Sequence, residues 1–258
     1  MSQIVIERIF ELDSMKKYPS ELFYKGDLDL LKRPKVSIVG TRRPSSYSRQ
    51  FTYALAKALA KRGVCVVSGA AMGVDTIAHE GAGVANTIAV VANGLDIRYP
   101  AINRTLIESI EKKGLLLSQF NDGFRATGWS FVVRNELVVA LGDILIVAEA
   151  DLNSGSMRSV EYAFKMGKEI WVLPHRLDES LGTNKLLIEG EAKVIYDVEI
   201  FASRFGQSVE SNIVKDAFFY FCQASPTFDE TVEKFGDRVY EAELEGSVTI
   251  HNGIVRLQ

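Results

Sequence analysis

Six short apolar runs, separated by segments of helical periodicity, constrain the fold of this chain more than any other feature. Each run is four or five residues long and consists mainly of β-branched residues and leucine, without the polar alternation of a half-exposed strand. The runs are VSIV (36–39), VCVV (64–67), IAVV (88–91), LLLS (115–118), ILIVA (144–148) and IWVL (170–173). Strands buried on both faces are typical of a parallel sheet covered by helices, so the sequence predicts an α/β fold.

Amphipathic helices are expected between these strands. After the first run, Phe51, Leu55 and Leu59 recur every four residues, and Gly63 supplies a stop. Residues 105–114 repeat the pattern and end in two lysines and a glycine. Because connections between parallel strands are right-handed, this alternation predicts a doubly wound, mostly parallel, Rossmann-like sheet. Ligands of such sheets bind at the carboxyl ends of the strands.

Composition divides the chain into four segments. They are a helical or irregular lead-in (1–35), the α/β domain (36–200), a polar linker (201–212) and a small C-terminal domain (213–258). The C-terminal segment shows three short helical patterns and then a hairpin that turns at Asn252-Gly253. This order predicts a winged-helix-like module.

Composition also argues against several classes of protein. No apolar run approaches the roughly 20 residues that span a bilayer, and the amino terminus has neither a basic start nor a small-residue cleavage site. Cys65 and Cys222 are expected to be unpaired core thiols, and three unclustered histidines do not indicate zinc. We therefore expect a cytoplasmic protein with no membrane span, no metal ion and no cofactor.

Charge is distributed unevenly along the chain. The formal net charge is −3, yet residues 30–74 contain nine basic side chains and no acidic one. Residues 207–258 contain nine acidic and four basic side chains. Lys57, Lys61 and Arg62 are expected on a solvated helix face, whereas the other six basic residues of the first group gather around the end of the first strand. An anionic partner is therefore compatible with an acidic chain.

Glycine-rich polar loops follow three of the expected strands, and the first loop is GTRRPSSYS (40–48). Gly40 permits close backbone approach, and Arg42 and Arg43 supply planar cationic donors. The loop matches neither G-x-G-x-x-G nor the P-loop pattern, so it suits a phosphate without indicating a dinucleotide or a nucleoside triphosphate. A tight turn with two solvated arginines is the alternative.

The second loop is SGAAMGVDTIAHEGA (68–82). Ser68, Gly69 and Gly73 are expected to form a turn whose N–H groups can hold an anion. Asp75 and His79 follow four residues apart on the next helix. Since no serine or cysteine nucleophile stands in a recognised elbow, we interpret this pair as fixing the turn rather than as catalytic.

The third loop is EADLNSGSMRSVEYA (149–163). Here Ser154, Gly155 and Ser156 are small residues placed before a helix, again at the ligand edge of the sheet. Like the other two loops it offers groups that hold an anion, without a nucleophile, a base or a metal ligand set.

A helical segment, FVVRNELVVALGD (131–143), lies just upstream of the fifth strand. Arg134 and Asn135 are expected at the opening of this helix, and Phe131 is either a stacking platform or a core residue. Together with the three loops, this composition favours a polyanion held along its backbone. Stacking of bases on an aromatic ring favours single strands.

The same motifs occur together in a known family. The chain resembles the DNA processing protein A (DprA/Smf) family in VSIVGTRRPSSYS, VVSGAAMGVDTIAHEGA, NGLDIRYPAINRTL, FVVRNELVVAL, VAEADLNSGSMRSVEYA and GTNKLLIEGEAKVI, in the same order and spacing. The resemblance covers roughly residues 18–198 and implies a non-enzymatic, extended Rossmann-like domain that binds single-stranded DNA and forms a homodimer. It also implies protection of incoming DNA in natural transformation and loading of the recombinase RecA against single-strand-binding protein.

The resemblance further assigns site residues. Arg42 matches the family's pocket arginine, and we group the neighbouring Arg43 with it. The other positions on pocket motifs are Gly40, Thr41, Ser68, Gly69, Gly73, Phe131, Arg134, Asn135, Ser154, Gly155 and Ser156.

The chain departs from the family at two positions where arginine is usual. They are Met72 and Glu136, and Arg43, Arg125 or Arg158 could supply the missing charge. In the tail, the third helical pattern (237–246) carries four acidic side chains that would repel phosphate. We therefore expect the tail to contact protein rather than duplex DNA.

Two other functions stay open at this point. Nucleotide phosphoribohydrolases of the LOG type have a related fold and a P-G-G-x-G-T-x-x-E loop, for which this chain has NSGSMRSVEYA. That stretch lacks the paired glycines and has Arg158 near the position of the catalytic glutamate. A small-nucleotide sensor would use the same loops without catalysis.

Overall fold

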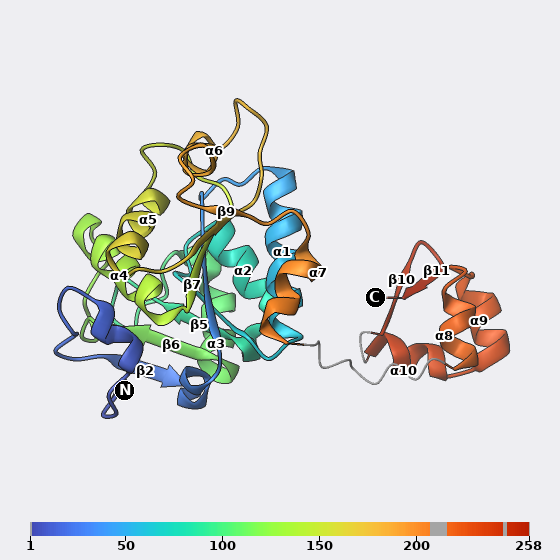
Figure 1. The fold of residues 1–258 in the computed structure, drawn as a ribbon. Helices are drawn as coiled ribbons and strands as arrows, with labels where there is room; N and C mark the ends of the chain where they lie inside the picture. Colours follow the sequence, from blue (N-terminus) through green and yellow to red (C-terminus); the bar gives the residue numbers. More distant parts are fainter. Residues whose placement is uncertain (1, 207–215, 245–246, 258) are drawn as a thin grey trace. The chain divides into compact units, whose positions relative to one another are not determined.

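A mixed nine-stranded sheet dominates the first part of the chain. The structure is a computed structural model that describes residues 2–206, 216–244 and 247–257, and it divides into two compact units, residues 1–209 and 210–258. In the first unit the strand order is β1-β2-β6-β5-β4-β3-β7-β8-β9, with helices on both faces (Figure 1). All neighbours from β6 across to β9 are parallel. The predicted α/β, Rossmann-like, mostly parallel sheet is thus confirmed.

Six of the parallel strands coincide with the six apolar runs to within one residue at each end. They are β3 (Lys35–Val39), β4 (Cys65–Ser68), β5 (Thr87–Val90), β6 (Leu115–Ser118), β7 (Ile144–Val147) and β8 (Ile170–Val172); a short β9 (Lys193–Val194) follows. Apart from Ile144, every residue of the six is buried, because both faces of the sheet are covered.

Alternate residues of each strand point to opposite faces, so each run supplies two helix layers. Val67, Ile88 and Leu115 face the layer that holds α4 (Gly128–Leu141) and α5 (Gly155–Lys165). Val66 faces the other layer. That layer contains α1 (Ser46–Ala60), α2 (Val74–Ala82), α7 (Val198–Ala202) and, over β5 and β6, α3 (Arg104–Lys113). A further helix, α6 (Leu181–Ile188), connects β8 to β9.

The lead-in is more than the helical or irregular segment predicted for residues 1–35. β2 (Phe23–Gly26) pairs antiparallel with β6, and β1 (Gln3–Ile4) pairs with β2, so the lead-in extends one edge of the sheet. Two 3-10 helices, η1 (Phe10–Ser14) and η2 (Leu28–Lys32), complete it. A strand of four residues with mixed polarity gives too short a pattern to be recognised from sequence.

Part of the predicted linker is helical. Phe201 in α7 is buried, and its ring centroid lies 5.0 Å from that of Trp171 in β8. A 3-10 helix, η5 (Ser203–Phe205), follows. Residues 201–205 therefore belong to the first unit, while residues 207–212 lie outside the described residues.

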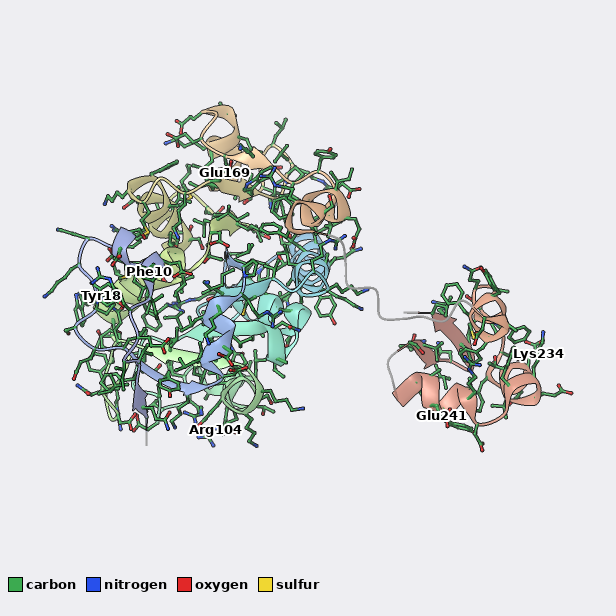
Figure 2. The ribbon with its side chains drawn as sticks, turned by 60° about the horizontal axis from the view of Figure 1, so that its bottom comes forward. Phe10, Tyr18, Arg104, Glu169, Lys234 and Glu241 are labelled. Atoms are coloured by element: carbon green, nitrogen blue, oxygen red, sulfur yellow. The ribbon has the colours of Figure 1, made fainter. Side chains whose placement is uncertain are left out.

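The second unit has its own small core. It contains α8 (Ala217–Cys222), α9 (Phe228–Phe235), α10 (Arg238–Leu244) and the hairpin of β10 (Val248–His251) and β11 (Ile254–Leu257). The hairpin turns at Asn252-Gly253, where both residues have positive φ, as a tight two-residue turn requires. Figure 2 shows Lys234 and Glu241 among the side chains of this unit. The winged-helix assignment and the exact domain boundaries stay predictions.

Two expectations from composition can be compared with the described residues. None of their helices has the length and apolarity that a membrane span requires. Cys65 and Cys222 are both buried and unpaired.

We predict that the lead-in contributes to the stability of the first unit. Leu12 in η1 is fully buried in the core on the α4 side, whereas Phe10 in the same turn is 76% exposed (Figure 2). Leu12→Ala should lower the free energy of unfolding by about 2–5 kcal/mol, since it leaves a cavity in a packed core. Phe10→Ala is the matched control and should change it by less than about 0.5 kcal/mol. Equal urea midpoints for the two variants would contradict this role.

Candidate nucleic-acid interface

A crevice lies where the strand order of the sheet reverses. β3 and β7 are parallel neighbours, but the chain leaves β3 for β4 on one side and leaves β7 for β8 on the other. The loops that follow the two strands therefore separate, which is where ligands of doubly wound sheets bind. The crevice has a volume of about 560 Å³. It is enclosed by the loop after β3, by α4 and by the start of α5.

Ten of the thirteen predicted site residues line this crevice. They are Gly40, Thr41, Arg42, Arg43, Phe131, Arg134, Asn135, Ser154, Gly155 and Ser156. Arg158 of α5 lines it as well, so two of the three arginines considered as substitutes, Arg43 and Arg158, reach the site. Glu136 does not line it, because its carboxylate accepts a hydrogen bond from Lys16 N at 2.9 Å in the lead-in.

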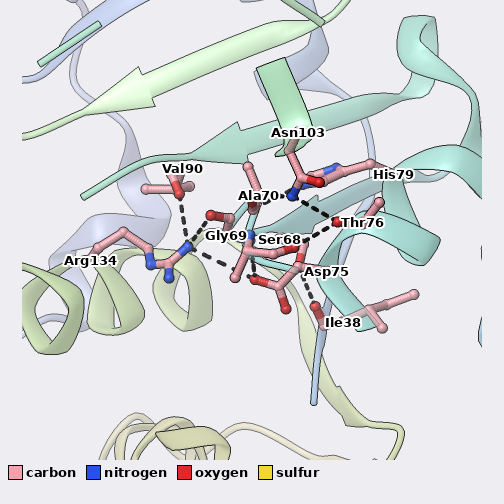
Figure 3. Close-up of polar contacts among 11 residues, drawn as sticks. Ile38, Ser68, Gly69, Ala70, Asp75, Thr76, His79, Val90, Asn103 and Arg134 are labelled. Atoms are coloured by element: carbon pink, nitrogen blue, oxygen red, sulfur yellow. Dashed lines mark hydrogen bonds and ion pairs between the residues drawn. The ribbon is translucent and has the colours of Figure 1, made fainter. Parts of the chain in front are cut away.

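Arg134 is not at the opening of its helix, as the sequence predicted. α4 begins at Gly128 behind a capping box made by Thr127 and Ser130, so Arg134 lies well inside the helix and is only 5% exposed. Its Nη1 donates to the main-chain oxygens of Gly69 and Val90, the latter at 3.1 Å (Figure 3). The guanidinium thereby ties α4 to the carboxyl ends of β4 and β5.

Asp75 and His79 fix the turn after β4, as the sequence analysis proposed (Figure 3). Asp75 Oδ2 accepts from Gly69 N at 3.1 Å and from Ala71 N at 3.3 Å, and it lies 3.9 Å from Arg134 Nη1. His79 Nε2 lies 3.3 Å from Ala70 N, which donates to it. Burial raises the pKa of Asp75, although Arg134 and the backbone donors oppose that shift.

The network around His79 specifies one neutral tautomer. His79 Nδ1 lies 2.5 Å from Thr87 Oγ1, and that hydroxyl donates its own proton to Val66 O at 2.8 Å. Nδ1 must therefore carry the proton, and Nε2 must accept from Ala70. Burial lowers the pKa of His79 to about 3, so the ring is neutral at physiological pH.

Part of the anion nest predicted at residues 68–73 is engaged within the protein, and the binding roles of Ser68, Gly69 and Gly73 stay predictions. Ser68 is buried and its hydroxyl donates to Ile38 O at 2.6 Å, so it is part of the sheet rather than of a ligand site. The N–H groups of Gly69 and Ala71 donate to Asp75. Sequence alone could not show that Asp75 takes up these two donors.

The glycines of the site serve close packing. A Cβ on Gly69 would lie 1.5 Å from Arg134 Nη1, so only glycine lets the guanidinium reach the strand end. Gly73 has φ +81°, and a Cβ there would lie 2.5 Å from Thr41 O. Gly40 is likewise packed against the first residue of α2. At these three positions the absence of a side chain permits close packing, whereas Gly155, which lines the crevice, has open space around it.

Phe131 is a partly exposed platform rather than a core residue. The guanidinium carbons of Arg42 and Arg134 lie 5.6 Å and 5.8 Å from its ring centroid, within the range of cation–π attraction. The ring of Tyr99, which the sequence analysis did not select, lies 6.0 Å away at 48°. An aromatic face flanked by two cations suits a nucleobase and its phosphates.

Two further elements complete the crevice. Glu149 joins its loops, because its main-chain oxygen accepts from Thr41 N at 2.8 Å and its carboxylate accepts from Ser45 N and Oγ at 2.9 Å. Partial burial raises the pKa of Glu149, but hydrogen bonds from serines at the start of α1 outweigh it and the pKa is lowered.

α5 begins at Gly155 without a side-chain cap or an acidic residue in its first turn, so its N-terminus favours an anion.

A metal site is not evident in the described segments. No group of three or more histidine, cysteine, aspartate and glutamate side chains among those residues is placed to hold an ion.

Comparison with protein families gives a match over most of the first unit. The model of the family DNA recombination-mediator protein A matches residues 9–206. The chain belongs to the DNA recombination-mediator protein A (DprA) family. The second unit lies beyond the match to the DprA model.

Several DprA relatives are similar in sequence. The DNA processing protein DprA of Streptococcus pneumoniae is 36% identical over 197 residues, which are 75% of this chain and 70% of the relative. The DNA processing protein DprA of Bacillus subtilis is 35% identical over 194 residues, 74% of this chain and 65% of the relative. The chain thus spans about two thirds of the length of these relatives.

Two solved DprA structures share the fold. One concerns the single-stranded DNA binding mode of DNA processing protein A from Helicobacter pylori; it is 43% identical, with a TM-score of 0.77, and the match covers 79% of this chain and 95% of that one. The other is DprA from Streptococcus pneumoniae, 34% identical with a TM-score of 0.72, over 78% of this chain and 73% of that one.

The buried His79 gives a pH-dependence prediction. Its pKa is about 3 when folded and about 6.5 when unfolded, so between these values the unfolded chain binds a proton that the folded chain does not. Its contribution therefore reduces the free energy of unfolding as pH falls from about 6.5 toward 3, by up to about 1.4 kcal/mol per pH unit. Urea unfolding of the wild type and of His79→Gln at pH 7 and pH 5 measures this. An equally steep loss of stability in both proteins would contradict it.

Proposed function

We propose that the crevice between β3 and β7 binds single-stranded DNA without altering it chemically. The observation that carries this proposal is that Arg42, Arg43, Arg134 and Arg158 line one crevice with the partly exposed ring of Phe131, which Arg42 and Arg134 flank. The arginines neutralise phosphates, and the ring stacks a base whatever its identity. The match to a relative described by its single-stranded DNA binding mode supports the same ligand.

The dimensions of the crevice favour a flexible strand. A volume of about 560 Å³ is in the range of small-ligand pockets, so it accepts individual nucleotides that have left a stack. A duplex keeps its bases paired and stacked, and it could present only its outer phosphates. We therefore expect binding to be selective for single strands.

The polar groups of the crevice do not favour an enzyme. The one carboxylate that lines it, Asp75, is buried and already accepts two backbone hydrogen bonds, so it is poorly placed as a general base. Incubation with nucleoside monophosphates tests the phosphoribohydrolase alternative, and steady release of free base would establish it. A mononucleotide that displaces an oligonucleotide at micromolar concentration would instead favour a nucleotide sensor.

The cellular role is proposed from membership of the family. We propose that the chain is cytoplasmic, protects single strands that enter during natural transformation, and helps to load RecA onto DNA covered by single-strand-binding protein. Its acidic second unit suits a protein contact better than a DNA contact. The rate of RecA filament growth on covered strands, with and without the chain, tests this role.

An apolar surface at one edge of the sheet suits the proposed homodimer. β9 pairs only with β8 among the described strands, so its outer edge is open. Exposed apolar side chains occur in the chain segment from the loop before α6 to the residues just after β9: Leu177, Leu181, Ile188, Val194 and Tyr196. We call this the α6–β9 surface and propose that two copies join through it, since apolar patches of this kind mark interaction sites.

Arg42 tests the DNA site. Arg42→Ala should weaken oligonucleotide binding for every sequence and should reduce the slope of log K against log salt by about 0.7, as expected when one phosphate contact with a single strand is lost. Fluorescence anisotropy at several salt concentrations measures this. Lys113→Ala, at the end of α3 beside the amino end of β6, is the charge-matched control and should bind as the wild type does. Unchanged affinity and slope in Arg42→Ala would remove Arg42 from the site.

Ile188 tests the dimer. It is 86% exposed on the α6–β9 surface, and an arginine there would have to be desolvated in the proposed interface. Ile188→Arg should sediment as a monomer at micromolar concentration, whereas Ile102→Arg, an equally exposed site on η4 (Ala101–Asn103), should not change the mass. A dimer that persists in Ile188→Arg would place the interface elsewhere.

A further inference from the structure

A second, smaller cavity adjoins the crevice. It has a volume of about 30 Å³ and shares Arg42, Ala71 and Phe131 with the crevice. The rest of its lining is apolar and consists of Met72, Val91, Ala92, Tyr99 and Pro100, with the backbone of Gly69. About one group of the size of a water molecule or a methyl group fits such a space.

Several backbone groups around this cavity already have hydrogen-bond partners within the protein. The N–H groups of Gly69 and Ala71 donate to Asp75, and Gly69 O accepts from Arg134. Val91 N donates to Leu117 O at 2.9 Å. These four groups are engaged within the protein, and the side chains that line the cavity offer stacking and apolar contact to a base.

Tyr99 and Met72 frame the mouth of the cavity beside Phe131. Tyr99 is 49% exposed, and its ring centroid lies 6.0 Å from that of Phe131. The two rings are inclined to each other and together line one side of the cavity. Met72 is 42% exposed and supplies a flexible apolar side chain on the same cavity. Arg42, above Phe131, remains able to meet the phosphate of the same nucleotide.

We propose that this cavity receives the 5-methyl group of a thymine whose ring lies against Phe131 and Tyr99. Among the four DNA bases only thymine carries an apolar group of this size, and apolar side chains recognise it by contact. The inference rests on the proposed function and adds a preference to it: at one position of the strand the site favours thymine over bases that lack the methyl group. Tyr99 and Met72 are then specificity-determining residues.

Deoxyuridine isolates the methyl group, because it differs from thymidine by nothing else. Short oligomers of deoxythymidine and deoxyuridine of equal length are titrated against the full chain at one salt concentration. Burial of one methyl group predicts about fourfold tighter binding of the thymidine oligomer. Equal affinity, or tighter binding of the deoxyuridine oligomer, would overturn the inference.

Substitutions separate the cavity from the crevice. Met72→Arg should abolish the preference for thymidine while it keeps or strengthens binding of both oligomers, because it replaces an apolar wall by a cation. Tyr99→Ala should reduce the preference, and Tyr53→Ala, an exposed tyrosine on α1, should retain it. For each variant, the ratio of the affinities for the thymidine and deoxyuridine oligomers is measured on one protein preparation. A partial loss of folded protein lowers both apparent affinities equally and leaves this ratio unchanged. An unchanged ratio in Met72→Arg would overturn the role of this cavity, and loss of binding to both oligomers by the wild type would overturn the proposed function itself.

Discussion

The candidate site depends on one buried guanidinium. Arg134 donates from α4 to Gly69 O after β4 and to Val90 O at the end of β5, and it lies 3.9 Å from the carboxylate of Asp75. The Asp75 carboxylate also accepts hydrogen bonds from Gly69 N and Ala71 N, which fixes the turn after β4. Removing one partner of such a buried pair leaves an uncompensated charge, which costs about 3–5 kcal/mol. One helix, two strand ends and one loop are therefore positioned by a single interaction.

This arrangement divides the arginines of the crevice into two kinds. Arg134 is buried and engaged by protein, although its Nε has no hydrogen-bond partner in the structure. Arg42, Arg43 and Arg158 are exposed and line the same crevice. A buried inner cation and exposed outer cations in a crevice with one aromatic ring suit a ligand with repeated negative charges and planar bases. That is the chemistry of a single nucleic-acid strand.

The parts of this structure that sequence predicts are those with strong local patterns. Six buried strands, α1 and α3 follow from apolar runs and helical periodicity, and the hairpin at Asn252-Gly253 follows from turn chemistry. The loops after β3 and β7 follow from topology, because parallel strands bring their carboxyl ends to one edge. The residue pattern indicated a single-stranded polyanion, and resemblance to a family specified DNA.

The parts that sequence missed depend on contacts between distant residues. The sequence placed Arg134 at the opening of a helix, because its hydrogen bonds to Gly69 O and Val90 O join residues that are far apart in the chain. The hydrogen bond from Ser68 Oγ to Ile38 O likewise joins two different strands and has no signal in the sequence. β2 is recognised as a strand only through its pairing with β6. Tyr99 gave no signal, since only the fold brings it next to Phe131.

The most direct test of the account is a crystal structure of the chain with a bound oligothymidylate. Phosphates should lie beside Arg42 and the first turn of α5, with a base against Phe131. A strand bound elsewhere on the protein, with the crevice between β3 and β7 empty, would contradict it.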